Sequence, residues 1–174
     1  GRLIACFGDP GLYAIKEVVE VPIVGIAEAS LSTALLLGQS FSILVALKKA
    51  VPMMENMIMN YGLSKRLASV KPLGTPVLNL EKDRQQTIKK MLSVGQKAID
   101  KGAEVLILGC AGMTGFSAML EKELGVAVID PVTTGYKVLE SLVELNLNIS
   151  KRGIYASPEP KKILGNQVLK MGVI

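Results

Sequence analysis

The chain has 174 residues with a formal net charge of +5; 49 % of the residues are apolar, 20 % are charged and none is histidine. This length is enough for one domain or two small lobes with a packed core, and the apolar content excludes a disordered chain. The absence of histidine excludes Ser-His-Asp and Cys-His catalysis and most transition-metal sites, and two cysteines without a CxxC pair are not a zinc motif.

The Lys and Arg residues are dispersed along the chain, and the three Phe and four Tyr are not interleaved with them, so we expect no nucleic-acid binding. The apolar runs are shorter than the stretch of about 18 residues that a membrane span needs. The first fifteen residues are interrupted by Asp9, Pro10 and glycines, which is not the pattern of a secretory signal. We therefore expect no membrane insertion and a cytoplasmic location.

Short runs rich in Val, Ile and Leu alternate with segments of helical period, and this alternation predicts an α/β fold with parallel sheets. The expected strands, in chain order, are Leu3–Cys6, Ile23–Ile26, Ser42–Leu47, Ala68–Leu73, Val105–Leu108, Ala127–Ile129 and Ile154–Ala156. The expected helices are one after Asp9, then Ala29–Leu37, Pro52 to the residue before Gly62, Asp83–Lys101, one after Gly115, and Thr133–Leu145.

Two features of these helices bear on function. Asp9 is expected to be the N-cap of the first helix, with Pro10 at its first position. Met53, Met54 and Met57 share one face of the third helix, and methionines at helical spacing are predicted to fill the core rather than to form a binding surface.

The sequence contains an internal repeat. A shift of 104 residues places Cys6 on Cys110, Gly8 on Gly112 and Gly11 on Gly115. Each copy reads as a strand, a cysteine, a glycine-rich turn, a helix and a second strand. Because ligands of open α/β sheets bind beyond the carboxyl ends of the strands, the repeat predicts two pseudo-symmetric lobes with both cysteines facing one cleft.

Two thiols on opposite walls of a cleft can perform proton transfer. A helix N-terminus favours the thiolate, and a thiolate is a base near neutral pH. One thiolate could remove a proton from an acidic carbon, backbone N–H groups could hold the resulting carbanion, and the other thiol could protonate the opposite face. This arrangement predicts racemisation without a metal or another cofactor. Inert buried cysteines and a redox-sensing pair are the alternatives.

Three acidic residues lie near the same strand ends. We expect Asp9 and Asp130 to be helix caps rather than catalytic groups. Glu28 begins a helix after a strand end, so it either faces the cleft as a substrate contact or supports the helix dipole.

Four segments resemble the hydantoin racemase branch of the aspartate/glutamate racemase superfamily: "ACFGDPGL" (Ala5 to Leu12), "VPIVGIAEAS" (Val21 to Ser30), "VPMMENMIMNYGL" (Val51 to Leu63) and "LGCAGM" (Leu108 to Met113). The resemblance implies that Cys6 and Cys110 are the paired acid/base residues and that the backbone of Phe7, Gly8, Ala111 and Gly112 lines the substrate site. It also implies two flavodoxin-like lobes, no cofactor and a homo-oligomer.

The sequence departs from the family pattern in two places. A segment that family members carry before the first cysteine, including an opening strand, is missing here. We therefore expect a first lobe of residues 1–38 plus 134–174 that lacks its usual N-terminal strand, and a second lobe of residues 39–133. Ala46 and Leu47 stand where relatives often have threonines, which changes either the pocket or its packing.

These observations lead to one functional hypothesis: a two-cysteine racemase that takes a small molecule, a 5-substituted hydantoin. The first alternative is allantoin racemisation or another isomerase or decarboxylase reaction of the superfamily. The second is a non-catalytic small-molecule binding or redox-sensing protein on the same scaffold. The sequence leaves the side chain of the substrate open.

Overall fold

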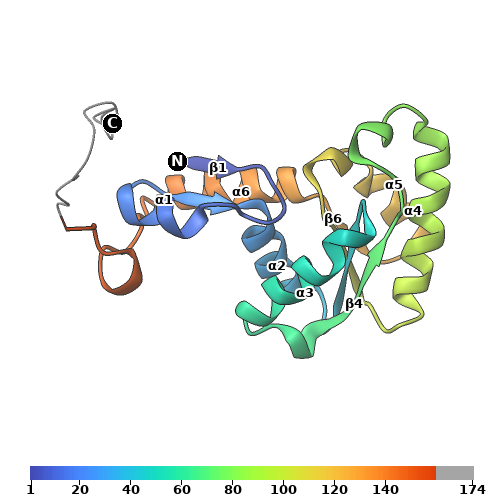
Figure 1. Ribbon diagram of the computed structural model, residues 1–174, viewed down its shortest axis with the longest axis horizontal. Helices are drawn as coiled ribbons and strands as arrows, with labels where there is room; N and C mark the ends of the chain where they lie inside the picture. The colour runs from blue at the N-terminus through green and yellow to red at the C-terminus, as the bar shows by residue number, and fades with distance from the viewer. Residues whose placement is uncertain (160–174) are drawn as a thin grey trace, which may run out of the picture.

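A computed structural model describes residues 1–159 and shows strands and helices in alternation along the chain (Figure 1). The strands are β1 (Arg2–Ile4), β2 (Ile23–Gly25), β3 (Phe41–Val45), β4 (Leu67–Pro72), β5 (Val105–Leu108) and β6 (Ala127–Ile129). The α-helices are α1 (Leu12–Val18), α2 (Ile26–Leu37), α3 (Val51–Asn60), α4 (Arg84–Ile99), α5 (Ser117–Leu124) and α6 (Pro131–Glu144). The predicted α/β class is confirmed.

The strands form two parallel sheets. β1 pairs with β2 in the small sheet, and the larger sheet has the order β4-β3-β5-β6. Figure 1 shows β1 and α1 at one end of the molecule and β4 and β6 at the other, with α2 and α6 running between them. Because all strands of a sheet are parallel, their carboxyl ends lie on one side, where the cysteine loops begin.

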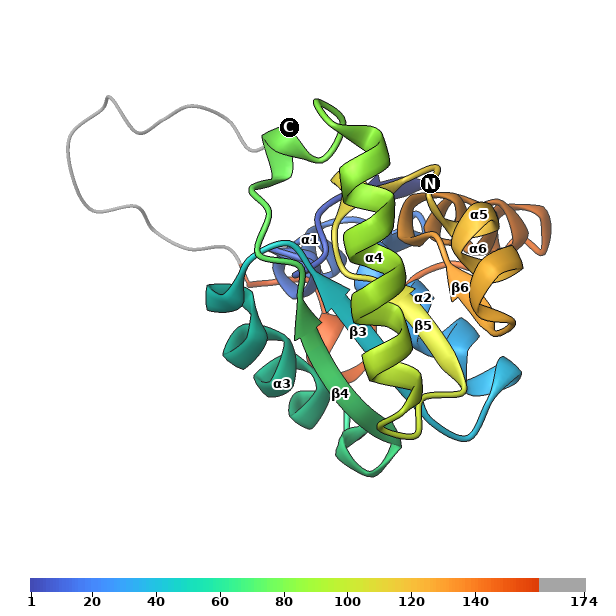
Figure 2. The ribbon, with the colours of Figure 1, turned by 90° about the vertical axis from the view of Figure 1, so that its right-hand side faces the viewer.

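Alternate side chains of the larger sheet enter two separate cores. Phe41, Ile43 and Val45 of β3 pack with α2 and α3 on one face, whereas Leu44 packs with α4 and α5 on the other. In β5 the same alternation sends Ile107 to the first core and Leu106 to the second. Figure 2 shows α4 in front of β3, β4 and β5. Helices on both faces explain why these strands read as continuous apolar runs.

Most sequence predictions of element bounds agree with the structure within one to three residues, and one predicted strand is wrong. Residues 154–156 lie in a short 3₁₀ helix, Gly153–Tyr155, and its surroundings, and not in a strand. The predicted strand Ile23–Ile26 ends at Gly25 because α2 begins at Ile26, three residues earlier than expected.

The predicted cap of the first helix is also wrong. Helix α1 begins at Leu12, after Gly11 in the left-handed conformation, and no side chain caps it. The Asp9 carboxylate accepts hydrogen bonds from the N–H groups of Ala27 and Glu28 instead. It therefore caps α2, which explains the early start of that helix.

We retain the division into lobes as a proposal. Its boundary between residues 38 and 39 separates the strands of the two sheets, and α6 packs against β1, β2 and α2. The part of the first lobe beyond residue 159 lies outside the described residues. Among residues 1–159, no helix combines the length and the apolar character that crossing a membrane requires.

Candidate active site

The two cysteines occupy equivalent places after strands of the two sheets. Cys6 stands two residues beyond β1, and Cys110 stands two residues beyond β5. Both are free thiols; Cys6 is exposed and Cys110 is half-buried. The predicted placement of both residues at the carboxyl ends of parallel strands is therefore confirmed.

One cavity of about 310 Å³ is lined by both cysteines. Phe7, Gly8 and Pro10 line it from the loop after β1, and Gly109 lines it beside Cys110. Its remaining walls come from the end of β3, from the start of α3 and from the loop after β4: Val45, Ala46, Leu47, Lys49, Ala50, Met53, Met54 and Val77. Most of these side chains are aliphatic, so the cavity between the two thiols is largely apolar.

The methionines of α3 correct one sequence prediction. Both Met53 and Met54 line the cysteine cavity. Met54 is buried at 1 % exposure and belongs to the core, as expected, whereas Met53 is 54 % exposed. The available signal was topological: α3 follows β3, so its first turn must lie near the carboxyl ends of the strands. Sequence reasoning also missed Lys49 and Val77, which lie in connections without a motif.

The backbone near the cysteines is arranged in two tight turns. The Cys6 carbonyl accepts from the N–H groups of Gly8 (2.8 Å) and Asp9 (2.9 Å), and the Cys110 carbonyl accepts from Met113 N–H (3.0 Å). The Gly8 amide is therefore engaged. Within residues 1–159, the amides of Phe7, Ala111 and Gly112 donate to no acceptor, so they are available to a ligand.

The residues that resemblance assigned to the substrate site are placed unevenly. Phe7 and Gly8 line the cysteine cavity, although the Phe7 side chain is 4 % exposed and belongs to the core. Ala111 and Gly112 are not part of the cavity wall. A Cβ on Gly112 would lie 3.7 Å from the Cys110 sulfur and 2.7 Å from Val77, so this glycine permits the close packing behind Cys110.

Glu28 lies outside the cavity wall. Its carboxylate pairs with the Lys16 ammonium at 2.7 and 2.9 Å, and the Lys16 side chain is only 8 % exposed. Glu28 is also in the first turn of α2, where a negative charge is favourable. Of the two roles left open by the sequence, this position favours the structural one.

Two further cavities lie near the cysteine cavity. One of about 780 Å³ shares Gly8, Pro10, Lys49 and Met53 with the cysteine cavity and is lined by Tyr13, Asn56, Asn60 and Tyr61 at its polar end. Burial raises the pKa of Tyr61 well above its ordinary value, and the nearby Asp9 charge adds to this shift, so its phenol remains neutral.

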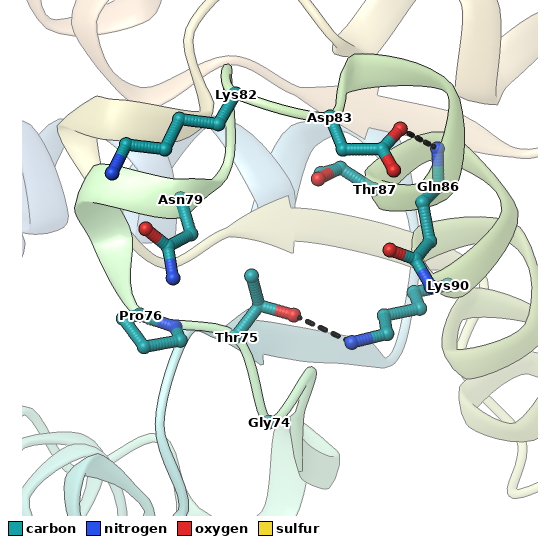
Figure 3. A pocket seen from close by; sticks show the side chains of 9 residues that line it. All are labelled: Gly74, Thr75, Pro76, Asn79, Lys82, Asp83, Gln86, Thr87 and Lys90. Carbon is teal, nitrogen blue, oxygen red and sulfur yellow. Dashed lines mark hydrogen bonds between the residues drawn. The ribbon is translucent and has the colours of Figure 1, made fainter.

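Figure 3 shows the second cavity, of about 440 Å³, between the loop after β4 and the first turns of α4. Lys90 donates to the Thr75 hydroxyl at 3.1 Å, and Asp83 caps α4 by accepting from the Gln86 amide (Figure 3). The short helix Val77–Asn79 separates this cavity from the cysteines, since Val77 lines one and Asn79 the other. In the described part of the chain, no three His, Cys, Asp or Glu residues are grouped as a metal site would require.

Comparisons with known proteins agree with this geometry. Residues 1–139 match the family model for Asp/Glu/hydantoin racemase. The chain is 42 % identical over 164 residues to a hydantoin racemase from Pseudomonas sp. (strain NS671), an alignment that covers 94 % of this chain and 66 % of that protein. The chain therefore spans about two thirds of the length of this relative.

Two solved structures are similar in fold and sequence. The crystal structure of allantoin racemase from Pseudomonas fluorescens superimposes with a TM-score of 0.87 at 38 % identity, over 94 % of this chain and 70 % of that one. Allantoin racemase from Klebsiella pneumoniae gives a TM-score of 0.86 at 38 % identity, over 95 % of this chain and 67 % of that one.

Proposed function

Because the chain belongs to the Asp/Glu/hydantoin racemase family, we propose that it is a cofactor-independent racemase that interconverts the enantiomers of a 5-substituted hydantoin. The observation that carries this proposal is that Cys6 and Cys110, which come from equivalent loops of two sheets, line one cavity. Racemisation needs two groups that can exchange a proton with opposite faces of one carbon.

The chemistry balances without a further reactant. The Cys6 thiolate takes the proton from C5 of the hydantoin, and the electrons of the C–H bond move into the adjacent carbonyl to form an enolate. The Cys110 thiol then gives its proton to the opposite face of C5. The product leaves the first cysteine as a thiol and the second as a thiolate, and the reverse reaction uses the two residues in exchanged roles.

The cavity supports stabilisation of the enolate oxygen. Phe7 lines the cavity, and within residues 1–159 its amide donates to no acceptor, so it can donate to the enolate oxygen. Ala50, the residue before α3, lines the cavity, so the positive end of that helix dipole lies at the cavity wall. Both features favour negative charge where the enolate forms.

The wall of the cavity favours an apolar substituent at C5. Val45, Ala46, Leu47 and Val77 offer no side-chain hydrogen bond, and a polar substituent buried against them would lose its partners in water. An alkyl or arylalkyl group gains from the same burial. Ala46 and Leu47 both contribute to this apolar wall.

Allantoin racemisation is the second candidate, and the similarity to two allantoin racemase structures supports it. Allantoin carries a polar ureido group in place of the alkyl substituent. Such a group would need to reach the polar cavity of Asn56, Asn60 and Tyr61, which shares Lys49 and Met53 with the cysteine cavity.

The decisive experiment is exchange of the C5 proton in D₂O, followed by NMR and polarimetry, with each enantiomer of a 5-alkyl hydantoin and of allantoin. Faster exchange and loss of optical rotation with the alkyl hydantoin would support the proposal. Faster exchange with allantoin would favour the second candidate. Binding without exchange would leave a non-catalytic binding protein, and decarboxylation of a malonate-type acid would show a different reaction of the superfamily.

We further propose that the protein works as a homo-oligomer in the cytoplasm. Several apolar side chains are exposed, among them Leu36 (85 %) and Leu145 (66 %), which is favourable when another subunit covers them. A reducing compartment keeps both thiols free, as the proposed chemistry requires. Light scattering coupled to size-exclusion chromatography tests the first statement.

A further inference from the structure

Each cysteine loop is joined to the N-terminus of a helix by a buried aspartate. In the first lobe, Asp9 accepts from Ala27 N–H at 3.1 Å and from Glu28 N–H at 2.8 Å. The Asp9 residue is only 8 % exposed, and its φ of 44° is in a region that residues other than glycine rarely adopt. The loop accepts this strained conformation because two hydrogen bonds hold the carboxylate in place.

Gly25 completes the fit around this carboxylate. A Cβ at Gly25 would overlap the carboxyl group of Asp9, so the carboxylate fills the space that a side chain would otherwise take. The two oxygens each accept from a different amide, which fixes both the distance and the orientation of the group. A longer side chain, or an amide with a single acceptor oxygen, cannot satisfy both amides from the same position.

Asp9 and Cys6 belong to one hydrogen-bonded turn, so the position of Asp9 determines that of the Cys6 backbone. Asp9 is three residues after Cys6, and its own N–H donates to the Cys6 carbonyl at 2.9 Å. The turn is therefore closed on itself by two hydrogen bonds to the Cys6 carbonyl, from Gly8 and Asp9, and attached to α2 by two others. The Cys6 backbone has little freedom left relative to α2, although the thiol itself is exposed.

Asp130 makes the corresponding joint in the second lobe. Its Oδ1 accepts from the amides of Val132 and Thr133 at 3.1 Å, which caps α6, and its Oδ2 accepts from Gly115 N–H at 2.8 Å. Gly115 ends the loop that begins at Cys110, and the Cys110 carbonyl is bonded within that loop to Met113. Asp130 is also 8 % exposed.

We propose that Asp9 and Asp130 are positioning residues, which hold Cys6 and Cys110 in register across the cavity by attaching each loop to a helix N-terminus. The link to racemisation rests on the proposed function, but the positioning itself does not. Proton transfer requires a donor and an acceptor that are close and correctly oriented. Displacement of a loop by about 1 Å therefore lowers the rate of racemisation, although the thiol itself is unchanged.

A crossed labelling experiment tests the positioning. Asp9→Ala, Asp130→Ala and the control Asp83→Ala are each treated with iodoacetamide at neutral pH, and alkylation of each cysteine is followed by mass spectrometry. Removal of either aspartate, the clamp of its loop, frees that loop, so we expect the alkylation rate of the attached cysteine to rise about threefold or more. Asp9→Ala should change Cys6 alone, and Asp130→Ala should change Cys110 alone.

Asp83→Ala is the control for the loss of an aspartate N-cap, here that of α4. Because Arg84 of α4 donates to the Gly115 carbonyl in the Cys110 loop, this control has a small effect on Cys110 and none on Cys6. Its effect reports what the loss of any cap does to the molecule. Equal changes at both cysteines in either clamp variant, or changes no larger than those in Asp83→Ala, would overturn the proposal.

Racemisation supplies the second readout. In Asp9→Ala we expect kcat to fall about a hundredfold with little change in KM, although the Cys6 thiol reacts faster with iodoacetamide. Asp9→Asn keeps one acceptor and the size of the side chain, so it should restore part of kcat. A purely electrostatic role predicts a rise in both rates, and that result would contradict positioning. Absence of exchange in the unsubstituted protein would refute the proposed function, while the labelling experiment would still show whether each aspartate acts on its own cysteine loop.

Discussion

The two cysteine loops have the same geometry but reach it with different residues. In both, the cysteine stands two residues beyond a strand, its carbonyl closes a tight turn, and a left-handed glycine follows (Gly11 at φ 72° and Gly115 at φ 85°). In both, a buried aspartate joins the loop to a helix N-terminus. Asp9 belongs to the loop and reaches a distant helix, whereas Asp130 belongs to the helix and reaches a distant loop.

The two aspartates come from different places in the chain, so the pseudo-symmetry preserves the carboxylate between loop and helix but not its position in the sequence. In the repeat, the position that corresponds to Asp130 is Ile26, so the first lobe has no aspartate at the start of its helix. Asp9 supplies the missing carboxylate, and Gly25 leaves room for it. A carboxylate beside the first amides of a helix stabilises that helix whether it belongs to the helix itself or to a neighbouring loop.

The largest expected effect comes from removing one thiol. Cys6→Ser and Cys110→Ser should each lower racemisation by about a thousandfold, because a hydroxyl is a far weaker base than a thiolate. If the loops face opposite sides of the substrate, each variant loses exchange with a different enantiomer. Exchange of each pure enantiomer in D₂O measures this, with the double variant as baseline. Loss of the same enantiomer in both variants would place the two thiols on one side.

A second prediction separates the first loop from the second. Gly25→Ala should destabilise the fold by about 1–3 kcal/mol, because its methyl group competes with the Asp9 carboxylate for one space. The added substitution Asp9→Ala removes the competitor, so the double variant should be more stable than the sum of the single effects implies. Urea unfolding of the four proteins measures the coupling. Strict additivity would show that Asp9 does not occupy that space.

Glu28 has no counterpart in the second loop, and its role can be separated from catalysis. Glu28→Gln should cost about 1–2 kcal/mol of stability, because the Lys16 ammonium is nearly buried and would lose its charged partner, while kcat and KM remain unchanged. The pair of Lys137 and Glu140, whose lysine is exposed, is the control, and Glu140→Gln should have a much smaller effect. A raised KM in Glu28→Gln would instead indicate a substrate contact.

The smallest effect is the pH dependence of the first clamp. Burial raises the pKa of the Asp9 carboxyl above its ordinary value of 3.8, and the hydrogen bonds from Glu28 and Ala27 oppose this shift. The contribution of Asp9 to stability is therefore complete below pH 3.8 and declines as the pH rises through the raised pKa.

Asp9→Asn does not titrate, so its stability relative to the unsubstituted protein should improve as the pH rises through that range. Urea unfolding of both proteins at a series of pH values measures the difference. A relative loss of stability in Asp9→Asn with rising pH would mean that the two hydrogen bonds outweigh burial.

Local patterns in the sequence determined much of this protein. Val105–Leu108 and Ala127–Ile129 were predicted with the bounds that the structure shows, because a continuous apolar run bounded by turns reports a strand buried on both faces. The constant offset between the two cysteine motifs indicated the equivalence of their loops. The pairing of the two thiols in one cavity followed from that repeat and from the common direction of parallel strands.

Only the tertiary structure decided which groups meet across the chain. Asp9 reads as the cap of the next helix, yet it caps α2 and accepts from an amide eighteen residues further along, because the Cys6 turn directs its carboxylate there. Met53 and Met54 are neighbours of one residue type and both line the cysteine cavity, but Met54 is buried in the core and Met53 is exposed. Periodicity reports which positions share a face; it carries no information on which distant amide, charge or cavity that face meets.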